Sequence, residues 1–287
     1  MSNVARAFEG EGPDVVPSRR TDTMERKPNA VQPAIEIHGL KKRFDLKNET
    51  VTALNDINVT INKGEFVSIV GPSGCGKSTL LFLMAGFTQP SEGILKVNGK
   101  PVTGPVTDLG IVFQRDVLFD WKTVLSNVMI QAEMRKLPRE AALEKARYLI
   151  ARVGLKNFEN AYPWQLSGGM RQRVSICRAL LHDAPLLMMD EPFGALDALT
   201  RDQMIIDLQR MWMENPRTAI FITHDIAEAI FLSDRVLVMS PRPGAIVEDI
   251  RVDLPRPREI EIRDEPAFID YQRRIRKIFK SLEVIHS

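Results

Sequence analysis

Short apolar segments alternate along the chain with segments of helical periodicity. The apolar runs have the length of strands and lie at residues 66–70, 109–113, 186–190, 218–222 and 235–239. Apolar residues recur at helical spacing in residues 199–213 and 226–232. Apolar strands that alternate with helices indicate a parallel sheet covered on both faces. The pattern therefore predicts an α/β fold.

Two regions depart from this alternation. Residues 34–38 and 51–61 alternate apolar and polar positions as strands do, and Asn98-Gly99 is a strong hairpin turn. We therefore expect an antiparallel β subdomain beside the parallel sheet. Between about residues 118 and 165 the strand pattern stops. Residues 140–150 combine strong helix formers with helical spacing, which predicts an all-helical insertion.

Both ends of the chain differ from the middle. Residues 1–33 carry four prolines, balanced charge and few large apolar residues, and we predict a disordered N-terminal tail. One domain is expected at residues 34–260, followed by a C-terminal helical tail at residues 261–287. Residues 271–282 of that tail are basic, and a solvated amphipathic helix is the preferred interpretation.

Composition narrows the functional classes. The chain has 287 residues with 39 Lys and Arg against 37 Asp and Glu, a net charge of +2, so we expect no nucleic-acid partner. Cys75 and Cys177 form no CxxC motif, which suits a reduced, cytosolic protein without a zinc framework. The longest apolar run, residues 80–87, is shorter than the roughly 18 residues that span a bilayer. The N-terminus lacks an apolar signal core, so a membrane role requires other subunits to supply the membrane part.

The strongest chemical signal follows the first apolar run. Residues 71–78 read GPSGCGKS and match G-x-x-x-x-G-K-[ST] between a strand and a helix. Glycines let successive backbone N–H groups turn toward phosphates, and the helix N-terminus adds its positive end. Lys77 is expected to reach the β- and γ-phosphates of a nucleotide, and Ser78 to offer its hydroxyl to Mg²⁺. Cys75 occupies a variable position of this motif.

Two carboxylates end the strand at residues 186–190. The carboxyl ends of parallel strands face the ligand crevice. Asp190 is expected to hold Mg²⁺ through its water shell, and Glu191 to orient and polarise the attacking water. The alternative is an exposed strand end followed by a helix cap.

Residues 166–173, LSGGMRQR, contain a second candidate anion site. Ser167 has the character of a helix N-cap, and Gly168 and Gly169 follow it. One nucleotide does not require two such sites on one chain. We therefore expect this segment to serve a nucleotide that a second copy of the chain holds.

With these motifs in this order, the sequence resembles the ATP-binding subunits of ABC transporters over about residues 34–255. The loop at 71–78 looks like Walker A, residues 166–172 like the family signature, and residues 187–191 like Walker B with its catalytic glutamate. Phe113-Gln114 resembles the Q-loop, and residues 195–197 resemble the D-loop. Thr223-His224-Asp225 resembles the H-loop.

The resemblance implies the fold of a P-loop ABC ATPase and a head-to-tail dimer that clasps two ATP molecules. It implies that Gln114 touches Mg²⁺ and senses the transmembrane partner, that His224 contacts the γ-phosphate, and that Asp197 acts across the dimer. The implied catalytic residues are Glu191, His224 and Lys77. The implied Mg²⁺ ligands are Ser78, Gln114 and Asp190. The implied nucleotide contacts are Phe44, Gly71, Pro72, Ser73, Gly74, Cys75, Gly76, Lys77, Ser78, Thr79, Gln114, Ser167, Gly168, Gly169 and Asp197.

Three of these residues have structural alternatives. Phe44 stands where the family places an aromatic ring under adenine, and it would equally suit the core of a strand. His224 follows a strand at the ligand edge, and a buried core histidine is its alternative. For Gln114 the alternative is a polar residue that merely ends a strand.

Residues 118–128 resemble a stretch of the nitrate, sulfonate and taurine importers, except that Asp120 replaces their usual proline. Residues 240–244, SPRPG, and residues 252–258, VDLPRPR, resemble the C-terminal region of the same group. The resemblance implies separate permease subunits, a periplasmic solute-binding protein and a place at the cytoplasmic face of the bacterial inner membrane. Trp121 is either a permease contact or a core residue of the insertion.

Other classes remain open at this point. An ABC transporter for another solute, or an exporter, would carry the same motifs. Chromosome, repair and ribosome-acting ATPases share the signature. However, the sequence has neither the heptads nor the basic stripe of the first group, and it has one cassette rather than the two expected of the last.

Overall fold

The computed structural model describes residues 32–47 and 49–284, and its centre is a six-stranded sheet in the order β10-β9-β3-β8-β7-β6. The strands are β3 (Phe66–Val70), β6 (Leu109–Val112), β7 (Leu186–Asp190), β8 (Thr218–Thr223), β9 (Arg235–Met239) and β10 (Ile246–Arg251). The first five are parallel to their neighbours, and β10 pairs antiparallel with β9. The predicted parallel sheet is therefore confirmed, whereas β10 was not predicted.

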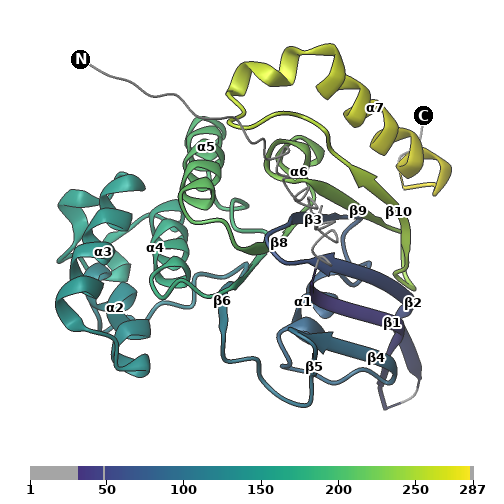
Figure 1. Cartoon of the computed structure of the whole chain (residues 1–287), viewed down its shortest axis with the longest axis horizontal. Coiled ribbons are helices and arrows are strands. Elements are labelled where there is room, and N and C mark those ends of the chain that lie inside the picture. Colours follow the sequence, from purple (N-terminus) through teal and green to yellow (C-terminus); the bar gives the residue numbers. More distant parts are fainter. Residues whose placement is uncertain (1–31, 48, 285–287) are drawn as a thin grey trace, which may run out of the picture. The chain divides into compact units, whose positions relative to one another are not determined.

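The N-terminal half also forms the predicted antiparallel sheet, in the order β2-β1-β4-β5 (Figure 1). Its strands are β1 (Pro33–Asp45), β2 (Thr50–Asn62), β4 (Glu92–Val97) and β5 (Lys100–Pro101). β1 is longer than the pattern at residues 34–38 predicted, and it begins at the last residue of the predicted tail. Residues 1–31 of that tail lie outside the described residues, as do the last three residues of the predicted C-terminal tail.

The strand pattern explains why the parallel sheet is covered on both faces. Val67 and Ile69 of β3 belong to one buried cluster, together with the antiparallel sheet and α1 (Lys77–Met84). Phe66 and Val70, which point to the other face, belong to a second cluster that the remaining helices complete. A strand that is buried on both faces is a continuous apolar run, and such runs identified these strands in the sequence.

The helical region forms a separate lobe beside the sheet in Figure 1. Its helices are α2 (Val124–Arg135) and α3 (Arg139–Arg152), followed by the short turns η1 (Lys156–Phe158) and η2 (Pro163–Gln165). Asn127 is buried at its base, where its side chain bonds the backbone of Phe119 in both directions. Trp121 is 73% exposed, so the interpretation of this residue as a core residue is wrong.

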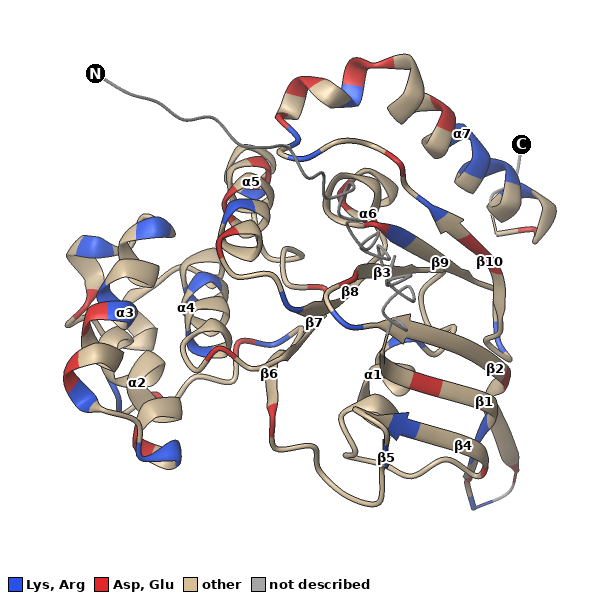
Figure 2. Cartoon of the chain, viewed as in Figure 1, with Lys and Arg blue, Asp and Glu red and all other residues tan. Residues whose placement is uncertain are grey.

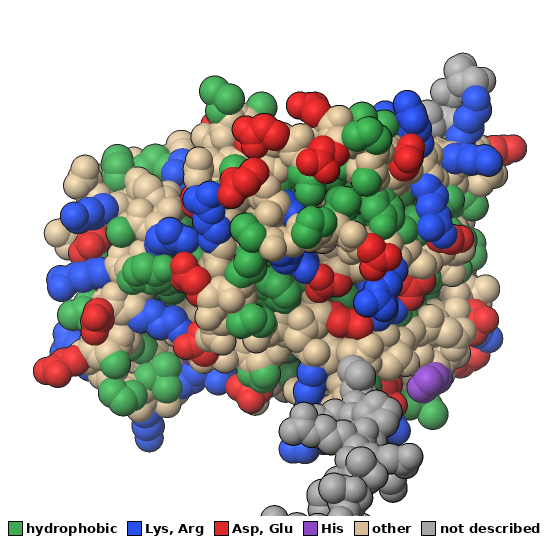
Figure 3. All heavy atoms as spheres, turned by 45° about the horizontal axis from the view of Figure 1, so that its top comes forward, with side chains coloured by type: hydrophobic (Ala, Val, Ile, Leu, Met, Phe, Trp, Pro, Cys, Tyr) green, Lys and Arg blue, Asp and Glu red, His purple; other side chains and the backbone are tan. Residues whose placement is uncertain are grey.

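On the face of the parallel sheet opposite α1, the helices are α4 (Gly168–Leu180), α5 (Ala198–Glu214) and α6 (Ile226–Leu232). The last described elements of the chain are η3 (Ile260–Asp264) and α7 (Pro266–Ser281). α7 buries Phe268, Ile275 and Phe279, and its basic residues gather in its C-terminal half (Figure 2). On the face drawn in Figure 3, acidic, basic and hydrophobic side chains are interspersed. Within the described ranges, no helix is both long enough and apolar enough to cross a membrane.

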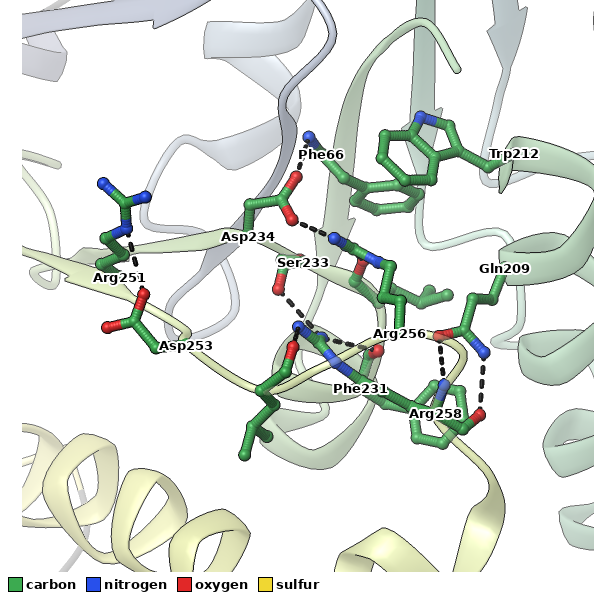
Figure 4. Close-up of polar contacts among 12 residues, drawn as sticks. Phe66, Gln209, Trp212, Phe231, Ser233, Asp234, Arg251, Asp253, Arg256 and Arg258 are labelled. Atoms are coloured by element: carbon green, nitrogen blue, oxygen red, sulfur yellow. Dashed lines mark hydrogen bonds and ion pairs between the residues drawn. The ribbon is translucent and has the colours of Figure 1, made fainter. Parts of the chain in front are cut away.

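Arg258, a buried residue of the segment between β10 and α7, binds this segment to the end of α6 through hydrogen bonds (Figure 4). Arg258 is 1% exposed, and its guanidinium donates to the carbonyl oxygens of Ile230, Phe231, Ser233 and Leu254. Its backbone N–H and carbonyl form a reciprocal pair of bonds with the Gln209 side chain of α5. Arg256 pairs with Asp234 and lies 4.7 Å from the centre of the Trp212 ring. The arginines of the sequence VDLPRPR thus hold α5 and α6 to the C-terminal segment.

Candidate nucleotide-binding and catalytic site

A glycine-rich loop connects β3 to α1 at the carboxyl edge of the parallel sheet. Gly74 and Gly76 have φ of +74° and +111°, in the region where only glycine is unstrained. A Cβ on Gly76 would also approach Leu54 Cδ2 to 2.7 Å, so the loop folds closely against the antiparallel sheet. The conformation of Gly76 explains physically why the motif requires glycine at that position, and Gly74 supplies a second glycine conformation at a variable position of the motif.

Lys77, the first residue of α1, is 6% exposed and lies under this loop. Its Nζ donates to the carbonyl oxygens of Gly71 at 2.9 Å and Pro72 at 3.0 Å. The ammonium group is therefore held at the loop that leads into α1, and a glycine-rich loop at a helix N-terminus is a favourable place for phosphate.

Asp190 ends β7 beside the loop and is 4% exposed, which excludes the interpretation as an exposed strand end. Burial raises the pKa of its carboxyl, against the opposing effects of Ser78 and Lys77. Its Oδ1 is buried without a hydrogen-bond partner among the described residues. A buried carboxylate oxygen that lacks a donor, next to the Ser78 hydroxyl, fits an Mg²⁺ site of oxygen ligands.

Glu191 meets two other predicted site residues. His224 Nδ1 lies 3.3 Å from Glu191 Oε2, and Gln114 Nε2 donates to the same oxygen at 3.4 Å. These three residues follow three neighbouring strands, β7, β8 and β6, so the sheet brings them together. The His224 side chain is 61% exposed, so the alternative of a buried core histidine is wrong.

Phe44 lines a cavity of about 560 Å³ that the glycine-rich loop and Glu191 also line. The ring is 40% exposed, so the alternative of a strand residue packed in the core is wrong. Lys42 Nζ lies 4.9 Å from the centre of this ring. The cavity is lined by Phe44, Leu46, Glu49, Val51, Ala53, Ser73, Gly74, Gly76, Lys77, Ser78, Thr79, Gln114, Glu191 and Arg242.

The signature and D-loop residues do not line this cavity. Ser167 caps α4 as predicted, since its Oγ accepts from Met170 N at 3.2 Å, and it is exposed. Gly169 lies close to the D-loop, because a Cβ there would approach Leu196 Cδ2 to 2.7 Å. Asp197 caps α5 through Thr200, whose hydrogen bonds lower the pKa of the Asp197 carboxyl. Within one chain, these residues form a second surface apart from the glycine-rich loop.

The attachment of α4 to the Q-loop segment had no signal in the amino-acid pattern. Gln172 Nε2 donates to the Phe113 carbonyl at 3.0 Å, and Arg171 Nε donates to Asp116 Oδ2 at 2.8 Å. Ser175 Oγ donates to the Asp116 carbonyl at 2.6 Å. The helix that carries the signature is therefore bonded directly to residues on both sides of Gln114, Phe113 and Asp116.

Glu228 is a buried carboxylate near the site that the sequence pattern did not predict. It is 5% exposed on α6 and accepts from Thr223 Oγ1 at 2.6 Å, and Arg201 Nε lies 3.6 Å from its other oxygen. Burial raises the pKa of Glu228 to about 7. Its position four residues after His224 was the available signal, but a glutamate at that spacing is ordinary on any helix.

The fold and the site together define a P-loop nucleoside triphosphatase. Two features lie at the carboxyl edge of the parallel sheet. One is a glycine-rich loop followed by a buried lysine, and the other is the pair of carboxylates at the end of β7. Comparison with known proteins narrows this class further.

The family model described as ABC transporter matches residues 54–194. A taurine import ATP-binding protein of Yersinia pestis is 44% identical over 239 residues, which are 81% of this chain and 94% of the relative. A nitrate import ATP-binding protein of Synechocystis is 43% identical over 255 residues, 87% of this chain and 96% of the relative. A dimeric post-hydrolysis structure of the ATP-binding cassette MJ0796 with ADP and Pi matches with a TM-score of 0.69 and 30% identity, over 77% of this chain and 100% of that one. The chain therefore belongs to the ABC transporter family, as an ATP-binding and ATP-hydrolysing subunit.

Proposed function

We propose that this chain powers an ABC importer, which takes up a small anionic solute through a separate permease. Relatives that align along most of the chain are named for the import of taurine and nitrate, and both solutes are small and carry an anionic group. One observation supports the assignment of ATP hydrolysis to this site. Gln114 and His224 both contact Glu191 beside the glycine-rich loop.

Nucleotide binding is assigned to the cavity between Phe44 and the loop. Phe44 offers an exposed ring on which adenine can stack. The loop of residues 71–76 directs its N–H groups to the phosphates, and Lys77 exchanges the carbonyl oxygens of Gly71 and Pro72 for phosphate oxygens. Thr79 lines the same cavity at the start of α1.

Three oxygen-bearing side chains would hold Mg²⁺ with the nucleotide: Ser78, Asp190 and Gln114. The unpartnered Oδ1 of Asp190 supports this assignment. When bound, the ion supplies positive charge that neutralises the phosphate oxygens.

Glu191 is assigned the activation of the attacking water. Its carboxylate lies at the mouth of the cavity, 20% exposed, and His224 and Gln114 bond one oxygen and leave the other for the water. A positioned carboxylate can accept the proton as the water attacks the γ-phosphate. His224 is assigned to the γ-phosphate and to holding Glu191 in this orientation.

Dimerisation completes the site in this proposal. Ser167 is exposed and Gly168 and Gly169 are half-buried, and together they form a helix N-terminus that does not line the chain's own cavity. A second chain placed head to tail would bring this N-terminus to the γ-phosphate, with Asp197 acting across the same seam. The dimeric MJ0796 cassette with ADP and Pi supports this arrangement.

The permease is assigned to the side of the helical lobe. The segment from Gln114 to Trp121 joins the catalytic edge to α2, and Trp121 is exposed there to receive a partner. Closure of the dimer around ATP would reach the permease through this segment. We place the chain at the cytoplasmic face of the bacterial inner membrane, with a periplasmic solute-binding protein delivering the solute.

The proposal is tested by co-purifying the chain with its permease and measuring ATP hydrolysis in proteoliposomes with solute-binding protein. Taurine, nitrate and alkylsulfonates are the anionic probes, and neutral and cationic solutes are the controls. We expect an anionic probe to stimulate hydrolysis and uptake together, and Lys77→Ala to abolish both. Stimulation by a non-anionic solute alone, or transport outward, would overturn the assignment as an importer of anions.

A further inference from the structure

The hairpin between β9 and β10 reaches back to the glycine-rich loop, although these segments are far apart in sequence. Gly244 N donates to the Ala53 carbonyl and Asn55 N donates to the Gly244 carbonyl, both at 2.9 Å. A Cβ on Gly244 would lie 2.1 Å from the Cys75 carbonyl oxygen, so the hairpin backbone lies directly against the loop. The SPRPG sequence at 240–244 therefore packs against the glycine-rich loop, and its Arg242 lines the cavity.

Arg242, at the centre of this sequence, points its guanidinium to the cavity. Nη2 donates to the Gly74 carbonyl at 3.3 Å, and the residue lines the cavity together with Lys77 and Phe44. The side chain is exposed, so a ligand can reach its remaining donors.

The neighbouring arginines of the two strands are paired, whereas Arg242 is not. Arg235 pairs with Asp249, and Arg251 pairs with Asp253, as Figure 4 shows for the second pair. Within the part of the chain that the structure describes, no carboxylate pairs with Arg242. An arginine at a phosphate-binding loop, with its donors unused by a carboxylate, has the chemistry that recognises phosphate oxygens.

We infer that Arg242 is a second cation of the nucleotide site and binds the phosphate chain of a nucleoside di- or triphosphate beside Lys77. The inference rests on the proposed use of this cavity for nucleotide. It gives the SPRPG hairpin a role in binding, since the contacts of Gly244 fix the position from which Arg242 reaches the cavity.

Arg242 contributes binding rather than catalysis, because it lies at Gly74 and not at Glu191. An interaction that is equal in the ground state and the transition state raises KM when it is lost and leaves kcat unchanged. Since the side chain is solvent-exposed, we expect the Kd for MgATP to rise about three- to tenfold without it, less than the more than tenfold effect of a typical charged hydrogen bond.

The test measures Kd for MgATP, MgADP and AMP by calorimetry, and kcat and KM for ATP, on the full chain. Arg242→Gln removes the charge, Arg242→Lys keeps it, and Arg251→Ala on β10 is the matched exposed control. We expect Arg242→Gln to weaken ATP and ADP more than AMP and to raise KM at constant kcat, with part of the affinity restored by Arg242→Lys. Affinities for Arg242→Gln within twofold of the Arg251→Ala control would overturn the inference.

Two further measurements distinguish a failure of this inference from a failure of the proposed function. Wild-type protein that fails to bind MgATP contradicts the proposed function itself, whatever the variants do. A lower melting temperature of Arg242→Gln without nucleotide, with unchanged nucleotide affinity, would show that Arg242 only fastens the hairpin and would overturn its role in binding. An unchanged melting temperature with a smaller ATP-induced rise supports the role.

Discussion

At the scale of single residues, Glu191 has a backbone conformation that β-strands do not use. Its φ is +46°, and its N–H donates to the Ile222 carbonyl of β8 at 2.9 Å. A non-glycine residue in this region costs about 1–3 kcal/mol, which the surrounding structure must offset. The turn directs the carboxylate away from the sheet and toward Gln114 and His224.

Glu191→Gln is therefore expected to lower kcat by at least about 100-fold, the usual range for the loss of a positioned general base. The amide keeps the size of the side chain but cannot accept the proton. The Kd for MgATP should stay near that of the wild type. Glu49→Gln is the matched control, since Glu49 lines the same cavity without bonding Gln114 or His224. Normal turnover of Glu191→Gln in a steady-state ATPase assay would remove Glu191 from the role of base.

Glu228 makes stability depend on pH. Its pKa is about 7 in the folded protein against an ordinary value of 4.5, because burial disfavours the charged form. The folded state thus binds the proton more tightly, so this contribution to stability is present below about pH 4.5 and is lost as the pH rises to about 7. The loss amounts to at most about 3 kcal/mol.

Glu228→Gln should remove this dependence, because an amide does not titrate. We expect the difference in unfolding free energy between variant and wild type to move in favour of the variant from pH 5 to pH 8, measured by urea denaturation. Glu144→Gln, at an exposed position on α3, should show a constant difference. A constant difference for Glu228→Gln as well would contradict the assigned pKa.

At the scale of elements, motifs that are contiguous in sequence could be predicted, because a strand, its loop and the helix that follows are local. β3 with its glycine loop, β7 with its carboxylates and the Ser167 cap of α4 belong to this class. The bond of Arg171 to Asp116 spans 55 positions, and that of Arg242 to Gly74 spans 168. Such contacts depend on how elements pack, and periodicity in one sequence carries no signal for them.

The attachment of the C-terminal segment to α6 gives a prediction at this scale. Arg258→Ala should destabilise the protein by about 3–5 kcal/mol, because four carbonyl oxygens lose their buried donor. Arg251→Ala, whose side chain is 84% exposed, should change stability by less than about 0.5 kcal/mol. Urea denaturation measures both, and equal stability of the two variants would show that Arg258 is dispensable for holding α6.

At the scale of the whole molecule, the proposed function requires one chain to carry two halves of a site on separate surfaces. The glycine-rich loop, Lys77 and Glu191 line the cavity. The exposed N-terminus of α4 at Ser167 does not line it. Two identical chains can join both halves only if each presents its α4 to the loop of the other. In the proposed function, the bonds of Gln172 to Phe113 and of Arg171 to Asp116 would link movement of α4 to the permease side.

Ser167→Arg should separate these two halves experimentally. The added side chain at the exposed helix N-terminus should block a partner but leave the chain's own cavity intact, so the Kd for MgATP stays constant. In a Glu191→Gln background, where MgATP should trap a dimer, the additional Ser167→Arg change should keep the protein monomeric in light scattering. A trapped dimer in the double variant would place the interface elsewhere.

The most direct measurement is the ATPase rate per chain as a function of protein concentration, with the molar mass followed by light scattering in the same samples. We expect the rate per chain to fall toward zero as dilution leaves only monomer, and to rise with the dimer fraction until it saturates. A rate per chain that stays constant from fully monomeric to fully dimeric samples would contradict a catalytic site shared between two chains.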